Sequence, residues 1–506
     1  MLINMHYLIG VDLGTQATKA CICDENGNIL AEAIVDSNLL YPEEGAVEQD
    51  PEEMLASVLR TIKNAVQASG VQPEKVAAIS IDGQMAGITG VDADGVAAIP
   101  YDSWLDTRCG ASRQPFLDYG EERVIQITGT PITYAHGPKI LWWKTQRPEQ
   151  YKKIYKFVQP AAYCTMRMCG LKGEDAFIDH TYLHFSGFAD TEKRQWSDEL
   201  LTALDVDKNK MPKIVRSFDN VGKLTPDMAN ACGLPAGVPM AAGCGDTVAS
   251  AFGAGIIKSG MMLDVAGTAS ILCCATNVYA PDTKHKTLLF APSVIENLYY
   301  PMAYINGGGM CLKWLRDDVL GGKYDYSQLN EMAAKVDPGS GNLFFLPHFS
   351  GRVCPNDTLV RGSFINLSWT HNAASLYRSI LEGISYEYSI YANILRELIP
   401  DLTLEKLISV GGGAKSGLFR QIKSDVLGTP VSTIEQTETA LLGCCAIAGT
   451  AAGIFPRPES FIEKVIETDD SENPNPSLYS FYQQRVSIYA DCIEDLHNVY
   501  SKIEKL

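Results

Sequence analysis

The sequence has few basic residues for its length, and it lacks long apolar runs. Its 506 residues contain 42 Lys and Arg against 60 Asp and Glu, which gives a formal net charge of -18. Nucleic-acid backbones and anionic membrane surfaces repel such a chain, so neither is an expected partner. No apolar run approaches the roughly 20 residues that cross a bilayer. The stretch Met1–Gly10 also lacks the basic and apolar regions of a secretory signal.

The 14 cysteines show no CxxC spacing and are too dilute for a disulfide scaffold. Several lie in apolar runs, such as Cys444 and Cys445, where a free thiol behaves as a small hydrophobe. This usage favours a reducing compartment, and we expect a cytoplasmic protein. His180 and His184 stand four apart, but no zincin glutamate lies between them and no third ligand is near, so they do not indicate a metal site.

What the sequence does contain is α/β patterning at a length that favours two domains. Residues 6–35 predict three strands, with an Asn-Gly hairpin signal in the turn DENGN. Residues 48–70 predict a helix, because Asp50 stands at the N-cap position, Pro51 at the first helical position and acids in the first turn. A buried strand, KVAAISIDGQ, follows. The first half therefore begins with the order β, β, β, α, β.

A weaker copy of this order begins about 250 residues later. The stretch GMMLDVAGTASILCCAT repeats the strand, Gly-Thr turn and strand of YLIGVDLGTQATKACIC. Residues 372–398 predict a long helix, KLISVGGG predicts a strand, and residues 416–428 predict a further helix. Self-similarity at half the chain length indicates two related α/β domains that face one another. We place them at residues 1–256 and 257–506.

The two Gly-Thr turns predict phosphate loops. Gly14 and Thr15 would expose backbone N–H groups and a hydroxyl, which can bind phosphate oxygens. Asp12 precedes them and repels an anion, but a carboxylate can hold Mg²⁺, directly or through its waters, while the ion bridges nucleotide phosphates. A lone turn of this kind is weak evidence. A second turn at Gly267 and Thr268 and the triple glycine of SVGGGAKSG together predict a nucleotide-binding frame.

The chain resembles the FGGY carbohydrate kinases over essentially its whole length, and within that family it is most similar to the xylulokinase and glycerol kinase branches. The matching stretches occur in the family's order: IGVDLGTQATK, EQDPEEM, ISIDGQMAG, SWLDTR, GPKILWW, GCGDTVASAFGAG, DVAGTAS, FLPHFSG, GSFINLSWTHNAASLYRSILEG and ISVGGGAKSGLFRQIKSDVLG. The resemblance implies two actin-like, ribonuclease H-like ATPase domains with ATP and a sugar in an active-site cleft between them. It also implies a small-molecule sugar or polyol as substrate. Dimers are common in the family, so a homodimer stays an open alternative.

The resemblance also implies roles for individual residues. Asp246 in GCGDT matches the family's catalytic base, in agreement with the need of a sugar hydroxyl for a carboxylate that accepts its proton. Asp12, which the chemistry of the turn assigns to Mg²⁺, matches part of the family's first phosphate loop. The positions that match nucleotide-binding residues are Gly14, Thr15, Gln16, Lys19, Gly267, Thr268, Gly309, Lys313, Gly413, Ala414 and Gly417. Those that match the sugar site, besides Asp246, are Gln84, Met85, Asp106, Arg108 and Thr247.

The sequence departs from the xylulokinase pattern in the sugar pocket. Ala86 stands where GQMHG has a histidine, Leu105 where asparagine is common, and Thr247 where asparagine usually follows the base. These changes make the expected pocket less polar or change its shape, and the loss of the histidine removes a hydrogen-bonding partner, through which polar pockets discriminate strongly. For Asp106 and Arg108, a structural ion pair is the alternative to sugar binding.

We therefore expect an ATP- and Mg²⁺-dependent kinase of a primary hydroxyl on a small ketose, with a pentulose such as xylulose, phosphorylated at the 5-position, as the first choice. Another ketose, a tetritol, glycerol or gluconate is the nearer alternative. A non-catalytic actin-like ATPase switch is the more distant one, although such a switch has no need of the sugar-site residues.

Overall fold

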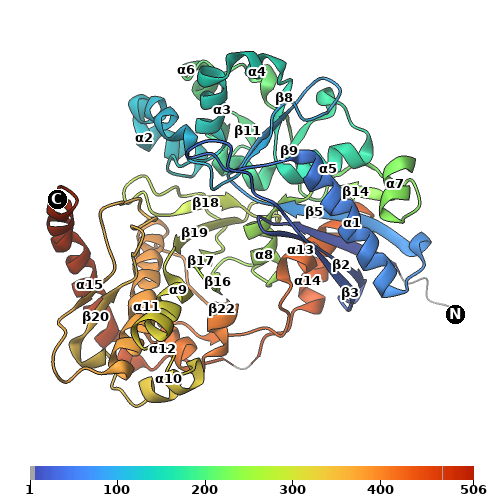
Figure 1. Cartoon of the computed structure of the whole chain (residues 1–506). Helices are drawn as coiled ribbons and strands as arrows, with labels where there is room; N and C mark the ends of the chain where they lie inside the picture. Colours follow the sequence, from blue (N-terminus) through green and yellow to red (C-terminus); the bar gives the residue numbers. More distant parts are fainter. Residues whose placement is uncertain (1–5, 470) are drawn as a thin grey trace. The chain divides into compact units, whose positions relative to one another are not determined.

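The computed structural model describes residues 6–469 and 471–506, which form two compact units (Figure 1). The first unit comprises Met1–Ile257, Phe290–Tyr300 and Glu438–Ile466. The second comprises Lys258–Leu289, Pro301–Thr437 and Glu467–Leu506. The chain thus changes unit at residues 257/258, next to the predicted boundary at 256/257. The grouping differs from the predicted domains mainly in Glu438–Ile466, which returns to the first unit.

The first unit is built on a seven-stranded mixed sheet in the order β13-β14-β5-β1-β2-β3, in which β15 also pairs with β5. The strands are β1 (Tyr7–Leu13), β2 (Ala17–Asp24), β3 (Ile29–Asp36), β5 (Val76–Gly83), β13 (Asn220–Lys223), β14 (Pro239–Ala241) and β15 (Cys244–Gly245). Strands β1, β2 and β3 form the predicted antiparallel meander, and β5 and β14 run parallel to β1.

Helix α1 (Pro51–Ser69) covers β2 and β3 on one face of this sheet (Figure 1). Its start is as predicted, because Asp50 accepts a hydrogen bond from the N–H of Glu52 and Pro51 occupies the first turn. Buried α1 side chains such as Val58 and Ile62 pack in one core with Ile9 and other residues of β1. Successive strand residues point to opposite faces, so Gly10 and Asp12 of β1 face away from α1.

The opposite face of β1 and β5 is covered by α13 (Thr439–Ala451), which comes from late in the chain. A Cβ atom on Gly10 would lie 2.3 Å from the carbonyl oxygen of Leu441, so glycine is needed for this close packing. Helix α8 (Asp246–Gly253) packs against α13 in the same way, because a Cβ on Gly253 would lie 1.8 Å from the carbonyl oxygen of Thr439. This packing explains why Glu438–Ile466 belongs to the first unit.

The remaining helices and strands of the first unit form its smaller layers and connections. The helices are α2 (Gln114–Thr128), α3 (His136–Gln146), α4 (Pro148–Lys153), α5 (Pro160–Cys169), α6 (Asp198–Ala203), α7 (Pro226–Cys232) and α14 (Glu459–Val465). The short strands are β4 (Glu48–Gln49), β6 (Thr89–Val91), β7 (Tyr101–Asp102), β8 (Lys156–Val158), β9 (Phe177–Asp179), β10 (Ala189–Asp190), β11 (Gln195–Trp196) and β12 (Lys213–Val215). Pairing of β4 with β7 places the loop after Asp102 beside the chain that leads into α1.

The second unit repeats the strand order of the first. Its sheet runs β18-β19-β17-β16-β22-β23, so β19-β17-β16-β22-β23 corresponds to β3-β2-β1-β5-β14 in both order and direction. Its strands are β16 (Met261–Ala266), β17 (Ser270–Cys274), β22 (Lys406–Val410), β23 (Val431–Ser432) and most of β19 (Tyr299–Ile305). Most of β18 (Leu289–Pro292), at the edge of the sheet, lies in the Phe290–Tyr300 segment that is grouped with the first unit. The duplication inferred from the Gly-Thr turns is confirmed, as is the α/β fold class.

In the described residues, five α-helices belong to the second unit. They are α9 (Gly308–Trp314), α10 (Tyr326–Ala333), α11 (Ala373–Leu398), α12 (Gly417–Leu427) and α15 (Pro476–Ile503), with a small hairpin of β20 (Phe344–Leu346) and β21 (Ser363–Ile365). The predicted helix over residues 372–398 is α11, with Asn372 as its N-cap. The predicted helix over 416–428 is α12.

Within residues 6–469 and 471–506, none of the helices combines the length and the apolar character needed to cross a bilayer. The expectation of no secretory signal at Met1–Gly10 concerns in part residues 1–5, which lie outside the described residues.

Candidate active site

The first Gly-Thr turn joins the ends of β1 and β2. It is closed by a hydrogen bond from the N–H of Gly14 to the carbonyl oxygen of Ala17, at 3.1 Å. Asp12 lies directly opposite Lys19 in the antiparallel pair β1–β2. Both side chains are therefore on the same face of the sheet, the face that α13 covers further along.

The Thr15 hydroxyl is held by side chains from two other segments. It donates to Oε1 of Gln84 at 3.1 Å and accepts from Nε1 of Trp104 at 2.9 Å. The Gln84 amide nitrogen donates to the carbonyl oxygen of Gly14 at 3.1 Å and to Oε1 of Gln49 at 2.8 Å. The one hydroxyl proton of Thr15 and both amide protons of Gln84 are thus used inside the protein. Backbone N–H groups are the donors left in this turn for an anion.

Asp246 begins helix α8 directly after β15. Its Oδ1 accepts from the N–H of Thr247 at 2.6 Å and from the Thr247 hydroxyl at 3.1 Å. Burial raises the pKa of Asp246 from its usual value to about 7, and the charge of Asp12 raises it further, against the lowering effect of the Thr247 hydrogen bonds. A partly buried carboxyl with a pKa near the operating pH suits a general base.

A third carboxyl group, that of Asp82, lies near Asp12 and Asp246. It was not predicted from the sequence. Asp82 lies opposite Asp12 in the parallel pair β1–β5 and opposite Cys244 in the pair β15–β5. It is fully buried, and Sγ of Cys444 donates to its Oδ2 at 3.2 Å. Burial raises the pKa of Asp82 well above its usual range. A charged residue at the end of the buried strand KVAAISIDGQ was the signal that could have identified it.

Burial also raises the pKa of Asp12, whereas a hydrogen bond with Asp82 and the charge of Lys19 lower it. Lys19 in turn forms an ion pair with Glu438, whose Oε2 lies 3.1 Å from Nζ. Glu438 immediately precedes α13 and is 419 residues from Lys19 in the chain. No local sequence pattern links two residues so far apart.

Asp106 and Arg108 are engaged with their own surroundings. Asp106 is buried and accepts from the N–H of Val47 at 3.0 Å and from Nε of Arg108 at 2.8 Å. The Arg108 guanidinium also contacts Asp102 at 3.0 Å and Glu48 at 2.7 Å. These contacts tie the loop that carries the exposed Trp104 to β4, and they match the structural alternative considered for the pair.

Met85 and Ala86 complete the loop after β5. A Cβ on Gly245 would lie 2.6 Å from the sulfur of Met85, so this loop packs against the residue before Asp246. Ala86 has a positive φ of 62° and is partly exposed. The segment from Gln84 to Gly87 therefore contributes no side-chain hydrogen-bonding group that is not already used by Gln84.

The second Gly-Thr turn lies between β16 and β17 in the second unit. Its carbonyl oxygens accept hydrogen bonds from the first residues of α9. The N–H of Gly309 donates to the carbonyl oxygen of Gly267 at 2.9 Å, and the N–H of Met310 donates to that of Thr268 at 3.1 Å. A Cβ on Gly309 would lie 2.5 Å from the Gly267 oxygen. The structure thus brings the predicted residues Gly267, Thr268 and Gly309 together. Lys313, one turn further along α9, is exposed.

The third predicted loop follows β22, which is paired with β16. Gly413 is close to the second turn, because a Cβ on it would lie 2.8 Å from the Cβ of Ala266. Ala414 is buried, and Gly417 opens helix α12, where Ser416 caps the N–H of Phe419. The two loops of the second unit therefore lie side by side at the ends of adjacent parallel strands.

A buried ion pair lies beneath these two loops. Asp264 of β16 is contacted by Nζ of Lys423 from α12, and it also accepts from the hydroxyls of Ser409 and Tyr388. Asp264 and Lys423 are both almost fully buried. Breaking such a pair leaves a buried charge without compensation. The pair therefore fixes α12 to the strand from which the second turn emerges.

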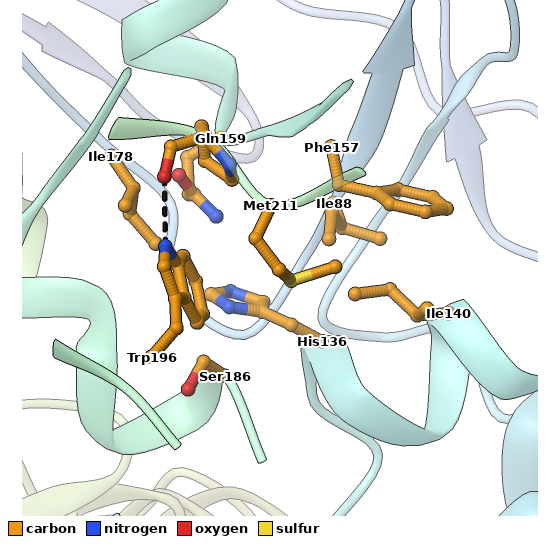
Figure 2. A pocket seen from close by; sticks show the side chains of 10 residues that line it. Ile88, His136, Ile140, Phe157, Gln159, Ile178, Ser186, Trp196 and Met211 are labelled. Carbon is orange, nitrogen blue, oxygen red and sulfur yellow. Dashed lines mark hydrogen bonds between the residues drawn. The ribbon is translucent and has the colours of Figure 1, made fainter. Parts of the chain in front are cut away.

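Figure 2 shows a small cavity in the first unit, lined by residues that include His136, Gln159, Trp196 and Met211. Its volume of about 10 Å³ is room for about one water molecule. Both ring nitrogens of His136 and Oε1 of Gln159 have no hydrogen-bond partner. The cavity is too small for a sugar, so it is not the substrate pocket.

His180 and His184 are both buried, and Nε2 of His180 lies 2.8 Å from the carbonyl oxygen of Ser293. In the part of the chain that the structure describes, no cluster of three or more His, Cys, Asp or Glu side chains could hold a metal ion. A magnesium ion at Asp12 would therefore take most of its ligands from water and phosphate, as Mg²⁺ commonly does.

Comparison with known proteins gives two family matches. Residues 7–253 match the N-terminal domain of the FGGY family of carbohydrate kinases, and residues 262–452 match the C-terminal domain of the same family. A xylulose kinase from Staphylococcus epidermidis is 29% identical over 491 residues, which cover 95% of this chain and 95% of that protein.

Solved structures share the fold over nearly the whole length. A gluconate kinase from Lactobacillus acidophilus superposes with a TM-score of 0.91 at 24% identity, covering 99% of this chain and all of that one. A ligand-bound xylulose kinase from the same organism gives a TM-score of 0.90 at 24% identity, covering 98% of this chain and all of that one. At this identity the likeness establishes the two-domain fold alone.

Proposed function

Because this chain belongs to the FGGY family of carbohydrate kinases, and is therefore an ATP-dependent sugar kinase, we propose that its acceptor is a pentulose such as xylulose and that its product is the 5-phosphate. The proposal is supported by relatives named xylulose kinase, which are about 29% identical over nearly the whole chain. Gluconokinases match at 26% identity, and gluconate stays among the alternative acceptors.

In the proposed reaction Asp246 accepts the proton of the attacking sugar hydroxyl. As the new bond forms between that oxygen and the γ-phosphorus, the bond to the β-phosphate oxygen breaks, ADP leaves, and the proton moves to the carboxylate. The role of general base is supported by the environment of Asp246, because its pKa of about 7 allows it to accept a proton near neutral pH. Thr247 holds one carboxylate oxygen, so that the other is free to face the sugar.

Each unit carries its own set of proposed nucleotide-binding residues. We propose that the backbone N–H groups of Thr15 and Gln16, together with Lys19, bind phosphate in the first unit. Gly14, whose own N–H donates to Ala17, would allow the tight turn that presents them, because a Cβ there would lie 2.8 Å from the Ala17 oxygen. In the second unit we propose the same function for the loop of Gly267 and Thr268, with Gly309 and Lys313 beside it. The loop of Gly413, Ala414 and Gly417 would bind the adenosine side.

The carboxylate of Asp12 fits a magnesium ion bound to nucleotide phosphates. It stands next to the first phosphate loop, where its ionised form would attract a cation. Burial raises its pKa, whereas the hydrogen bond with Asp82 and the charge of Lys19 favour the ionised form. When bound, Mg²⁺ would neutralise charge on the phosphates. The protein's own contribution is to orient that carboxylate through the β1–β2 turn and the neighbouring Asp82.

The proposed sugar-binding residues divide into two groups by their contacts. Met85 and Thr247 lie beside the base and could contact the sugar. Gln84, Asp106 and Arg108 have their polar groups engaged within the protein, so we propose that they act by holding the two loops around the sugar. A cytoplasmic location and a homodimer stay predictions.

The proposed function is tested by ADP release from the purified protein with MgATP and a panel of acceptors. The panel contains D-xylulose, L-xylulose, ribulose, erythritol, glycerol and gluconate. We expect the highest kcat/KM with a pentulose. Preferred turnover of gluconate or a polyol would contradict the pentulose assignment and leave the kinase assignment intact.

A further inference from the structure

The ion pair between Lys19 and Glu438 lies where the proposed nucleotide phosphates would bind. Lys19 projects from β2 next to the first phosphate loop, directly across from Asp12. Glu438 reaches the same point from the residue before α13, with 3.1 Å between its Oε2 and Nζ of Lys19. The lysine is thus already paired with an anion of the protein at the position where it would meet an anion of the ligand.

The surroundings of Lys19 are otherwise acidic. The charge of Lys19 lowers the pKa of Asp12, and that of Glu438 raises it, so both act on this carboxyl. Burial raises the pKa of Glu32 of β3, the charge of Glu438 raises it further, and that of Lys19 lowers it. Lys19 therefore stands among three carboxyl groups, and any phosphate that approaches it meets their repulsion.

The pair is free to exchange partners. The Lys19 side chain is 40% exposed and that of Glu438 23% exposed, and ion pairs exposed to this extent are weak. A polyphosphate carries several charges and can replace a single carboxylate at an ammonium group. The backbone next to Glu438 is held in place, by contrast, because the helix that follows it, α13, packs on β1 at Gly10.

We propose that Glu438 is an internal competitor of the nucleotide phosphates for Lys19. Before nucleotide binds, Glu438 holds the ammonium group at the mouth of the first phosphate loop. On binding, Lys19 exchanges the carboxylate for phosphate oxygens. Glu438 therefore weakens nucleotide affinity, and it acts through Lys19. This inference rests on the proposed function, since it takes Lys19 as a phosphate-binding residue.

The test is calorimetric titration of the full-length protein with Mg²⁺ and the β,γ-imido analogue of ATP, at low ionic strength where charge effects are large. Glu438→Gln removes the competing charge and keeps the shape. We expect it to tighten binding about 2- to 5-fold, which corresponds to the upper half of the range for an exposed ion pair. Lys19→Met should weaken binding.

The double variant decides whether the effect passes through Lys19. In the Lys19→Met background, Glu438→Gln should tighten binding clearly less than in the unaltered protein, because only the direct repulsion between Glu438 and phosphate is then removed. Equal tightening in both backgrounds would show general charge repulsion and overturn the proposal, as would unchanged or weaker binding in the single variant. Glu199→Gln is the matched control, because Glu199 forms an exposed pair with Arg123 away from the phosphate loops and its loss should not alter the affinity.

Failure of this inference can be distinguished from failure of the proposed function. Turnover of the acceptor panel by the unaltered protein reports on the kinase assignment alone. Normal turnover with no tightening in Glu438→Gln would overturn only the competition. A protein that binds no nucleotide analogue would overturn both.

Discussion

Replacing Asp246 with asparagine tests the chemical step directly, because the change keeps the size of the side chain and removes its capacity to accept a proton. A positioned general base contributes about 10²- to 10⁴-fold to the rate. At 1.36 kcal/mol per factor of ten, this corresponds to about 2.7–5.4 kcal/mol of transition-state stabilisation. We expect kcat to fall by that factor, while the affinity for nucleotide is retained.

The pH dependence supplies the second part of this test. Because burial and Asp12 place the pKa of Asp246 at about 7, its ionised fraction rises about tenfold between pH 6 and pH 8. The base must be ionised to act, so kcat/KM for the acceptor should rise by about that factor with increasing pH. An ordinary aspartate near 3.8 would be ionised throughout this range and give a flat profile.

The assay is steady-state ADP release from pH 5.5 to 9 with the unaltered protein, Asp246→Asn and Thr247→Val. Residual activity of Asp246→Asn shows any pH effect that arises from ATP itself. Thr247→Val removes a hydrogen bond that favours the ionised carboxyl, so the rising limb should move to higher pH. A flat profile for the unaltered protein, or near-normal turnover in Asp246→Asn, would refute the assignment of the base.

Three further variants test the supporting structure. Gly309→Ala should weaken binding of the MgATP analogue about tenfold or more by calorimetry, because its Cβ would lie 2.5 Å from the Gly267 oxygen and displace the second phosphate loop; unchanged affinity would contradict the loop's placement. Lys423→Met should lower the free energy of unfolding in urea by about 3–5 kcal/mol, since it leaves Asp264 buried without its partner; a neutral effect would argue against an ionised pair. For Asp82→Asn, the melting temperature measured relative to that of the unaltered protein should rise as pH increases from acid to alkaline. A carboxyl whose folded-state pKa is raised stabilises the unaltered protein fully below its unfolded-state pKa, near 3.8, and this stabilisation is lost as pH rises through the folded-state pKa. A difference in melting temperature that does not vary with pH would contradict that shift.

Local signals in the sequence predicted much of the fold. The start of α1 was predictable because Asp50 and Pro51 occupy positions that satisfy or omit the free N–H groups of a helix start. The repeated strand, Gly-Thr turn and strand predicted two related α/β domains, and the two sheets indeed share their strand order. Helix α13 could not be assigned to a sheet in this way. Its sequence is apolar on all sides, and its partner strand β1 is more than 400 residues away.

The parts of the site that lie within a sequence motif were predictable. The contacts between residues that are distant in the sequence were not. Asp246 and the Gly-Thr turns follow from motifs. The engagement of both amide protons of Gln84 depends on Gly14 and Gln49, which only the folded chain brings together. The pairing of Lys19 with Glu438 is likewise a product of packing and has no signature in the sequence.

The proposed reaction of this kinase transfers a phosphoryl group to a primary hydroxyl of a pentulose. The most direct measurement is proton-coupled ³¹P NMR of the product formed from MgATP and D-xylulose. We predict one sugar-phosphate resonance split by two protons of a CH₂ group, as expected for the 5-phosphate. Release of inorganic phosphate with no sugar ester, or a phosphate bound to a secondary carbon, would contradict the account.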